Sequence, residues 1–161
     1  MAVRDVLLYP DRRLKRVAVP AQAADAARAG LDLADTMNAL GHCVGLAAPQ
    51  IGEGIRVVIV DVTGHPKAAE SNGRLLLTNP RIVRSEGREI GREGCLSIPD
   101  LTANVARAKS IVVEHAAGVT ESTGFEARCL QHEIDHLDGL LFLDRVASIV
   151  DDVFRRKSYS A

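Results

Sequence analysis

Aromatic side chains are scarce in this chain: Phe, Tyr and Trp make up 3% of its 161 residues, and Trp is absent. Because 47% of the residues are apolar, we expect a core built from Val, Leu, Ile and Ala. No apolar run reaches the length of about 20 residues that spans a bilayer. Residues 1–20 carry charges such as Arg4, Asp5 and Arg12 in place of a signal peptide's apolar segment. We therefore expect no membrane anchor, no contact with membranes and no export.

A charge excess and a cysteine framework are missing as well. The net charge is −1, so composition gives no reason to expect DNA binding. Three cysteines in a chain without an export signal argue against a disulfide scaffold and for a reducing compartment. The length suits one domain, residues 1–161, with a core of its own. We expect a cytoplasmic protein that acts as a monomer.

Hydrophobic patterning predicts an α+β fold. Apolar positions at Ala27, Leu31, Ala34, Met37 and Leu40 predict a helix over residues 24–40, with Gly41 at its C-terminal cap. The expected strands cover residues 56–62, 75–83 and 106–114, and the expected loops cover residues 64–73, 87–94 and 116–124. Helices are expected over residues 125–137 and 147–156. Strands followed by a helix, without regular alternation, favour α+β over a doubly wound fold.

A His-Glu-x-x-His motif lies in the expected helix 125–137. His132 and His136 are four residues apart, so both imidazoles project from one helix face and can reach one metal ion. Glu133 lies beside that face, where it can hold a water and take its proton. Seen alone, the motif could also be an exposed, charged helix turn. A catalytic metal requires a third protein ligand as well.

The third ligand has several candidates, which are the three cysteines, His42, His65, His115 and the carboxylates that follow the motif. Cys129 lies about 7–8 Å along the helix axis from the metal position, which is too far for its short side chain, so we interpret it as an apolar wall residue. Cys43 lies in a run of small residues that suits packing. Cys95 follows Gly94 and can approach the helix from a sheet; a thiolate with two imidazoles fits Zn or Fe(II). Asp151 and Asp152 remain carboxylate alternatives.

The chain lacks what the protease classes with this motif use. In the metzincin pattern HExxHxxGxxH, Gly139 matches the glycine, but Phe142 occupies the third His position. No Glu follows Glu133, so the late Glu ligand of thermolysin-like enzymes is absent. A zinc endopeptidase is therefore disfavoured.

Residues 43–52 form a run of mostly small residues that leads into Pro49 and the polar Gln50. Small residues let the backbone approach another group closely, and Gln50 supplies an amide donor. The alternative is an ordinary tight connection.

Three stretches together resemble one family, the peptide deformylases. They are residues 45–50 (GLAAPQ), 93–97 (EGCLS) and 131–136 (QHEIDH), in the family's order and spacing. The resemblance covers residues from about 6 to about 146. It implies antiparallel or mixed β-sheets packed around a central metal-binding helix. It also implies removal of the formyl group from N-terminal formyl-methionine of nascent chains, with release of formate.

The resemblance also implies roles for individual residues. Cys95, His132 and His136 would hold one divalent metal, usually Fe(II), with Zn, Ni or Co as substitutes. Glu133 would move the proton, while the Gln50 side-chain amide and the backbone N–H of Leu96 would meet the developing oxyanion. Residues expected around the substrate are Val44, Gly45, Phe125, Arg128 and Cys129.

Some positions depart from the family pattern. Cys43 replaces the usual first Gly, which should crowd or re-aim the loop beside the substrate. Residues 116–124 look short for the family's hairpin, and the tail after Val146 is brief. Transient ribosome association through Arg155, Arg156 and Lys157 is one expectation, and a solvated helix end is the other. A third hypothesis is a metal-binding or ribosome-associated protein that has lost catalysis through the Cys43 change.

Overall fold

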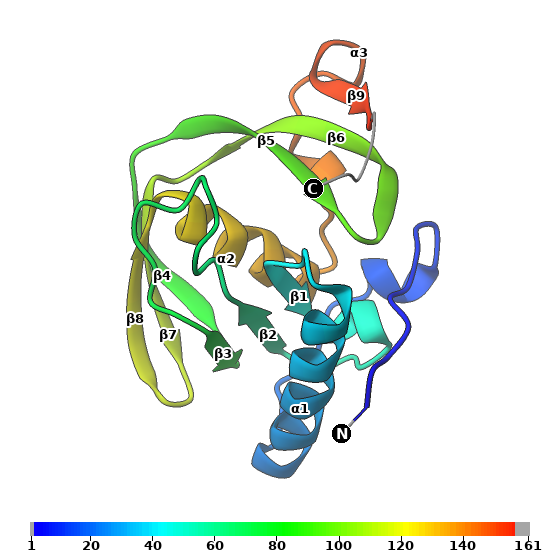
Figure 1. The fold of residues 1–161 in the computed structure, drawn as a ribbon, viewed down its shortest axis with the longest axis vertical. Coiled ribbons are helices and arrows are strands. Elements are labelled where there is room, and N and C mark those ends of the chain that lie inside the picture. Colours follow the sequence, from blue (N-terminus) through cyan, green and yellow to red (C-terminus); the bar gives the residue numbers. More distant parts are fainter. Residues whose placement is uncertain (1, 157–161) are drawn as a thin grey trace.

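A computed structural model describes residues 2–156 and shows helices and antiparallel strands arranged around one central helix (Figure 1). The helices are α1 (Ala23–Leu40), α2 (Gly124–Leu137) and α3 (Ile149–Asp152), with 3₁₀ turns at Arg12–Lys15, Ala48–Ile51 and Phe142–Arg145. The strands are β1 (Gly45–Ala47), β2 (Val57–Val60), β3 (Leu75–Thr78), β4 (Arg81–Glu86), β5 (Glu89–Cys95), β6 (Ile98–Arg107), β7 (Ser110–His115), β8 (Gly118–Thr123) and β9 (Val153–Arg155). The central α2 confirms the predicted helix 125–137, and the α+β class is confirmed.

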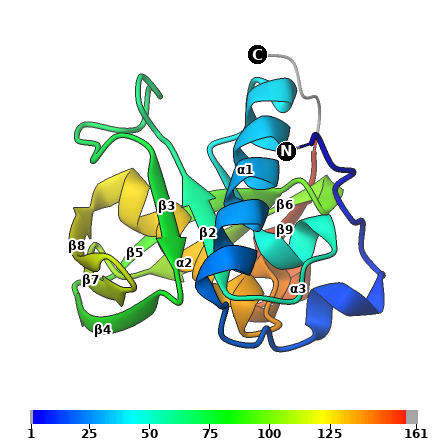
Figure 2. The same cartoon turned by 90° about the horizontal axis from the view of Figure 1, so that it is seen from below.

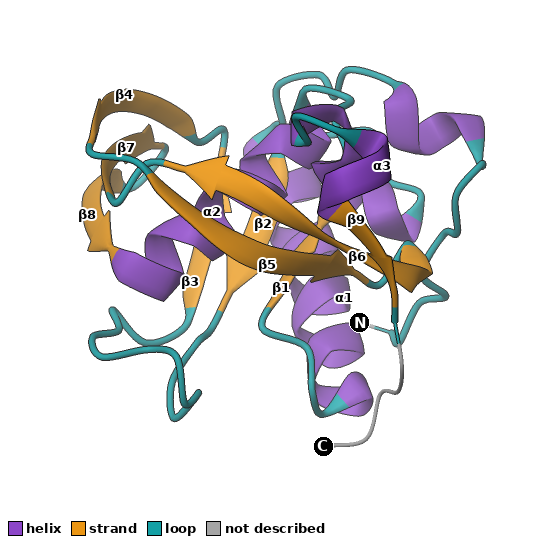
Figure 3. Cartoon of the chain, turned by 90° about the horizontal axis from the view of Figure 1, so that it is seen from above, coloured by secondary structure: helices purple, strands orange, loops and turns teal. Residues whose placement is uncertain are grey.

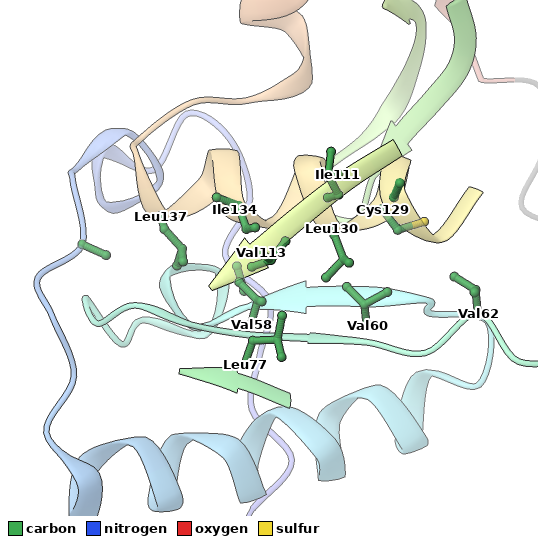
Figure 4. Packing of buried hydrophobic residues seen from close by; sticks show 13 residues of the cluster. Val58, Val60, Val62, Leu77, Ile111, Val113, Cys129, Leu130, Ile134 and Leu137 are labelled. Carbon is green, nitrogen blue, oxygen red and sulfur yellow. The ribbon is translucent and has the colours of Figure 1, made fainter. Parts of the chain in front are cut away.

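The sheet β1–β2–β3 separates the two long helices (Figure 2). Successive side chains of β2 point to opposite faces. Val58 and Val60 pack with the apolar face of α2, whereas Val57 and Ile59 pack with α1. Figure 4 shows the α2 side of this arrangement. Burial of β2 on both faces explains its unbroken apolar sequence.

Helix α1 and its cap at Gly41 are confirmed, but its predicted buried face is correct only in part. Met37 is buried and Ala34 packs against the core, whereas Ala27 is exposed and Leu31 is 51% exposed. The buried side chains are Ala26, Ala29, Asp32, Leu33, Thr36 and Met37. The buried face of α1 includes polar residues because the N-terminal segment packs over them. Asp32 accepts a hydrogen bond from the Ala2 backbone N–H at 2.8 Å. Thr36 accepts one from the Arg4 backbone N–H at 2.9 Å.

The other two sheets, β4–β7–β8 and β5–β6–β9, contain strands that the sequence did not predict. The loops expected over residues 87–94 and 116–124 are wrong, because β5 and β8 occupy most of them. Both belong to antiparallel hairpins, with β6 and β7 respectively, and carry mostly polar residues, since one face of each is open. The expected helix over residues 147–156 is correct for one turn only, since β9 follows and pairs with β6.

Strands β5 and β6 arch across α2, as Figures 1 and 3 show. A third apolar cluster lies beneath this sheet and joins Cys95 and Ile98 to Leu14, Leu141 and Phe142. The chain thus brings the end of β5 close to the inner face of α2. Among residues 2–156, no helix is long and apolar enough to cross a membrane.

Candidate active site

Helix α2 positions the two histidines by burying its opposite side. Leu130, Ile134 and Leu137 pack into the core against β2 and β7 (Figure 4). His132 and His136, one turn apart, then project toward β5, with their ring centroids 5.1 Å apart. The helical spacing of the motif therefore produces the paired imidazoles that it predicts.

Cys95 meets this pair from the end of β5. One ligand atom from each of Cys95, His132 and His136 lies within 4.8 Å of the other two, and Cys95 Sγ is 3.4 Å from His136 Nε2. One ion could contact all three atoms, and a thiolate with two imidazoles is a donor set that Zn and Fe(II) accept. The three side chains therefore fit a divalent transition metal.

Gln50 lies beside the same sulfur. Its Nε2 donates to Ser97 Oγ at 3.1 Å and lies 3.6 Å from Cys95 Sγ. Its Oε1 accepts the Ala47 backbone N–H at 3.0 Å, which fixes the orientation of the amide. The side chain is 2% exposed. Gln50 is thus a buried donor aimed at the Cys–His–His group, not part of an ordinary connection.

Glu133 lies between the histidines and β1. A Cβ on Gly45 would lie 2.5 Å from Glu133 Oε2, so the glycine is needed for the carboxylate to fit. Glu133 Oε1 is buried and has no hydrogen-bond partner among the described residues. Burial raises the pKa of Glu133 to about 7. A carboxyl group with a pKa near neutrality can both accept and return a proton.

A buried network of charged side chains holds the His132 ring through its Nδ1 atom. Glu93 accepts hydrogen bonds from His132 Nδ1 at 3.0 Å, from Arg107 through two nitrogens and from Arg128 at 2.7 Å. Burial alone would raise the pKa of Glu93, but the bonds from His132 and Arg107 lower it to about 2. The bond to Nδ1 leaves His132 Nε2 for the ligand group and fixes the ring's orientation.

Arg107 extends this network along α2 to Asp135, three residues after His132. Its Nη1 donates to Asp135 Oδ2 at 2.6 Å, and Arg145 donates twice to the Asp135 carboxylate. The roles of Arg107, Asp135 and Arg145 were not predicted from the sequence. One signal was available: Asp135 and Arg107 are charged residues inside a buried helix and strand, where charges occur only when paired.

A cleft of about 320 Å³ opens onto these groups. All the residues predicted to contact the substrate line this cleft, and so does Leu96. The predicted residues are Val44, Gly45, Phe125, Arg128 and Cys129. His65, a candidate third ligand in the sequence, also lines the cleft and stacks on Phe125 with ring centroids 4.4 Å apart.

Cys43 is accommodated without disturbing β1. Its Sγ donates to the Gly45 carbonyl at 3.1 Å, and Gly45 stays in register with Val60. Burial raises the pKa of Cys43 to about 12, so the side chain is a neutral thiol near pH 7. The expected crowding of this loop is therefore not seen in the backbone pairing.

The remaining residues considered from the sequence lie outside the Cys–His–His group. Asp151 and Asp152 form hydrogen bonds with Ser148 at the start of α3 and do not line the cleft. Cys129 packs in the apolar cluster beneath α2, as predicted. Arg155 is exposed in β9, Arg156 lines the cleft, and Lys157 lies outside the described residues.

Comparison with known proteins gives consistent matches. The family model described as polypeptide deformylase matches residues 3–151. The peptide deformylase of Rhizobium meliloti is 40% identical over 166 residues, covering 98% of this chain and 92% of that protein. The peptide deformylase of Alkalilimnicola ehrlichii is 42% identical over 167 residues, covering 98% and 89%.

Solved structures agree with the sequence matches. A peptide deformylase from Legionella pneumophila has a TM-score of 0.80 and 38% identity, covering 92% of this chain and 88% of that chain. A Met-Ala-Ser-bound class I type b peptide deformylase from Acinetobacter baumannii has a TM-score of 0.80 and 33% identity, covering 90% and 100%. With a matching family model over nearly the whole length and full-length relatives at this level of identity, the chain belongs to the peptide deformylase family.

Proposed function

We propose that this protein is a metal-dependent hydrolase that removes the formyl group from N-terminal formyl-methionine of new polypeptides and releases formate. The observation that carries the proposal is the meeting of Cys95, His132 and His136 with Gln50 and Glu133 in one cleft. Deformylase relatives of similar length support the reaction class.

Cys95, His132 and His136 would hold the metal. A divalent ion there supplies the Lewis acidity that activates water near neutral pH. By resemblance to the family, the native ion would be Fe(II), with Zn, Ni or Co as substitutes, and thiolate and imidazole donors accept all of these metals. Glu93 assists by keeping the His132 ring in place.

Glu133 would carry the proton through the reaction. Its carboxylate accepts a proton from the attacking water as the new C–O bond forms at the formyl carbon. It then gives that proton to the amide nitrogen as the C–N bond breaks, which yields formate and a free amine. The free Oε1 and the pKa near 7 suit both transfers.

The Gln50 amide and the Leu96 backbone N–H would stabilise the oxyanion that develops on the formyl oxygen. Removal of one such donor typically costs about 3–4 kcal/mol in the transition state. Because Ala47 and Ser97 hold the Gln50 amide in advance, little reorganisation is needed when charge develops.

The cleft would hold the methionine side chain and the peptide beyond it. Val44 and Gly45 would present backbone groups, while Phe125, Arg128 and Cys129 would border the side chain. Support comes from their common place in the cleft and from the Met-Ala-Ser peptide bound to the Acinetobacter baumannii relative. Arg128 would offer its stem, since its guanidinium is bound to Glu93 and to the Val105 and Glu89 carbonyls.

The proposed setting is the cytoplasm, with a monomer acting on nascent chains and associating transiently with the ribosome.

The substrate test compares formyl-Met-Ala-Ser with acetyl-Met-Ala-Ser and unmodified Met-Ala-Ser. We expect one formate per free amine from the formyl peptide, no acetate from the second and no cleavage of the third. Cleavage of the unmodified peptide would indicate a peptidase and contradict the proposal.

A further inference from the structure

The mouth of the cleft carries charge of one sign. The charged side chains that line the cleft are Lys67, Arg92, Arg128 and Arg156, with Glu93 and Glu133. Both carboxylates are buried, and Glu93 is already bound by three cationic or imidazole side chains. Lys67 and Arg92 are exposed. A chain with a net charge of −1 thus presents a cationic rim to its substrate.

Arg92 on β5 is held in one orientation at this rim. Its Nε donates to Asn104 Oδ1 on β6 at 3.1 Å. Its guanidinium carbon lies 3.8 Å from the centroid of the Phe154 ring, which β9 supplies. A cation over an aromatic face and a fixed hydrogen bond both restrict the side chain. The guanidinium is therefore placed before any substrate arrives.

Strand β9 brings a second cation to the same place. Arg156 follows β9, and its guanidinium lies against β5 at Gly94, where any side chain on residue 94 would collide with it. Gly94 and Arg92 are two residues apart on β5 and so face the same side of the sheet. Figure 3 shows the sheet β5–β6–β9. Through this sheet, Arg92 and Arg156 line the cleft together, and Phe154 stacks on Arg92.

The distance from the ligand group indicates which substrate residue meets Arg92. Arg92 precedes Cys95 by three strand positions, roughly 10 Å at about 3.3 Å per residue. An extended peptide that starts at the Cys–His–His group and runs beside β5 toward Arg92 points its first side chain to α2, on the side of β5 that Glu93 and Cys95 face. Its second side chain then points to the face that carries Arg92 and Gly94, roughly 7 Å from the start and within reach of a long arginine side chain. A carboxylate there would pair with the guanidinium.

We infer that Arg92 is a specificity-determining residue that favours formyl-methionyl peptides with an acidic second residue. The inference rests on the proposed deformylase function and deepens it. Arg92 selects by charge at the rim and takes no part in bond breaking.

The test measures kcat/KM for formyl-Met-Xaa-Ala-Ser amides in which Xaa is Glu, Gln or Lys. The terminal amide removes a competing carboxylate. We expect Glu to exceed Gln by about two- to fivefold at low salt, as one partly exposed ion pair allows. Lys should fall below Gln, and 0.5 M NaCl should shrink the spread, since salt screens exposed charges over about 3–10 Å.

Variants of Arg92 then test whether this residue causes the preference for the Glu peptide. Arg92→Gln should remove most of it and Arg92→Glu should reverse it, while Arg84→Gln should keep it, because Arg84 is exposed on β4 and does not line the cleft. The ratio between peptides is unaffected by partial unfolding of a variant. Equal rates for all three peptides, or a Glu preference that survives Arg92→Gln, would overturn the inference. No formate from any peptide would instead overturn the proposed function.

Discussion

At the residue scale, the fit between Gly45 and Glu133 is the most demanding contact in the site. Gly45→Ala places a methyl group 2.5 Å from Glu133 Oε2 and must move the carboxylate. A displacement of about 1 Å in a catalytic group can lower the rate about 100-fold. We therefore expect a loss of that size in formate release, with the thermal midpoint changed little. Gly54→Ala, where a Cβ has open space, is the control and should retain full activity.

Gln50 is tested by an exchange of nearly equal shape. Gln50→Glu keeps an oxygen to accept from Ala47 but removes the Nε2 donor. We expect kcat to fall about 10²–10³-fold with little change in KM, because the donor acts on charge present only in the transition state. Ser97→Ala removes only a partner of Nε2 and should cost much less. A fall in kcat/KM caused by KM alone would argue against an oxyanion role.

Much of the site could be predicted at the residue scale. The spacing of His132 and His136, the placement of Cys95 after a glycine and the lone amide of Gln50 are local features, and the structure brings all of them together. Arg107, Asp135 and Arg145 could not be assigned, because their role depends on β6 crossing α2 on the side that carries the histidines. That crossing is a tertiary contact with no local pattern in the sequence.

At the element scale, the end of α2 depends on one backbone conformation. Gly139 has φ of +73°, and a Cβ there would lie 2.6 Å from the Lys15 carbonyl oxygen. Gly41 has the same φ of +73° but nothing within 4 Å of its Cβ position. Gly41→Ala should therefore cost about 1 kcal/mol of unfolding free energy from backbone strain alone.

Gly139→Ala should cost about 2–4 kcal/mol, because it adds a clash with fixed backbone to the same strain. Urea unfolding followed by circular dichroism compares the two variants. Equal losses would mean that the contact between residue 139 and the Lys15 turn does not constrain the helix end.

The elements differ in how far the sequence predicts them. Helices α1 and α2 and strand β2 could be predicted from the spacing of their apolar residues and, for α1, from the cap at Gly41. Strands β5 and β8 were missed because their open faces carry polar residues and because Gly91 and Gly94 resemble turn signals. In the structure these glycines make room for the Arg128 and Arg156 side chains. The buried face of α1 was only partly predicted, because the N-terminal segment covers the polar residues Asp32 and Thr36.

At the scale of the whole molecule, the ligand group links β5 to the central helix α2. A metal bound only by the folded state should stabilise it by about 4 kcal/mol at 1,000 times its dissociation constant. For a chain of this length that corresponds to roughly 8–16 °C in the thermal midpoint. We expect chelation to lower the midpoint by that amount and readdition of metal to restore it. His132→Ala, which lacks one ligand, should show almost no response to either treatment.

The central claim, that this cleft performs metal-dependent deformylation with Glu133 as proton carrier, is tested most directly by measuring formate. Wild type and Glu133→Ala would be purified without oxygen, loaded with Fe(II) and given formyl-Met-Ala-Ser, with bound metal measured in the same samples. We expect formate from the wild type and a rate lower by about 10²–10⁴-fold in the variant, with equal metal in both. Formate release by Glu133→Ala at the wild-type rate, or none from metal-loaded wild type, would contradict the account.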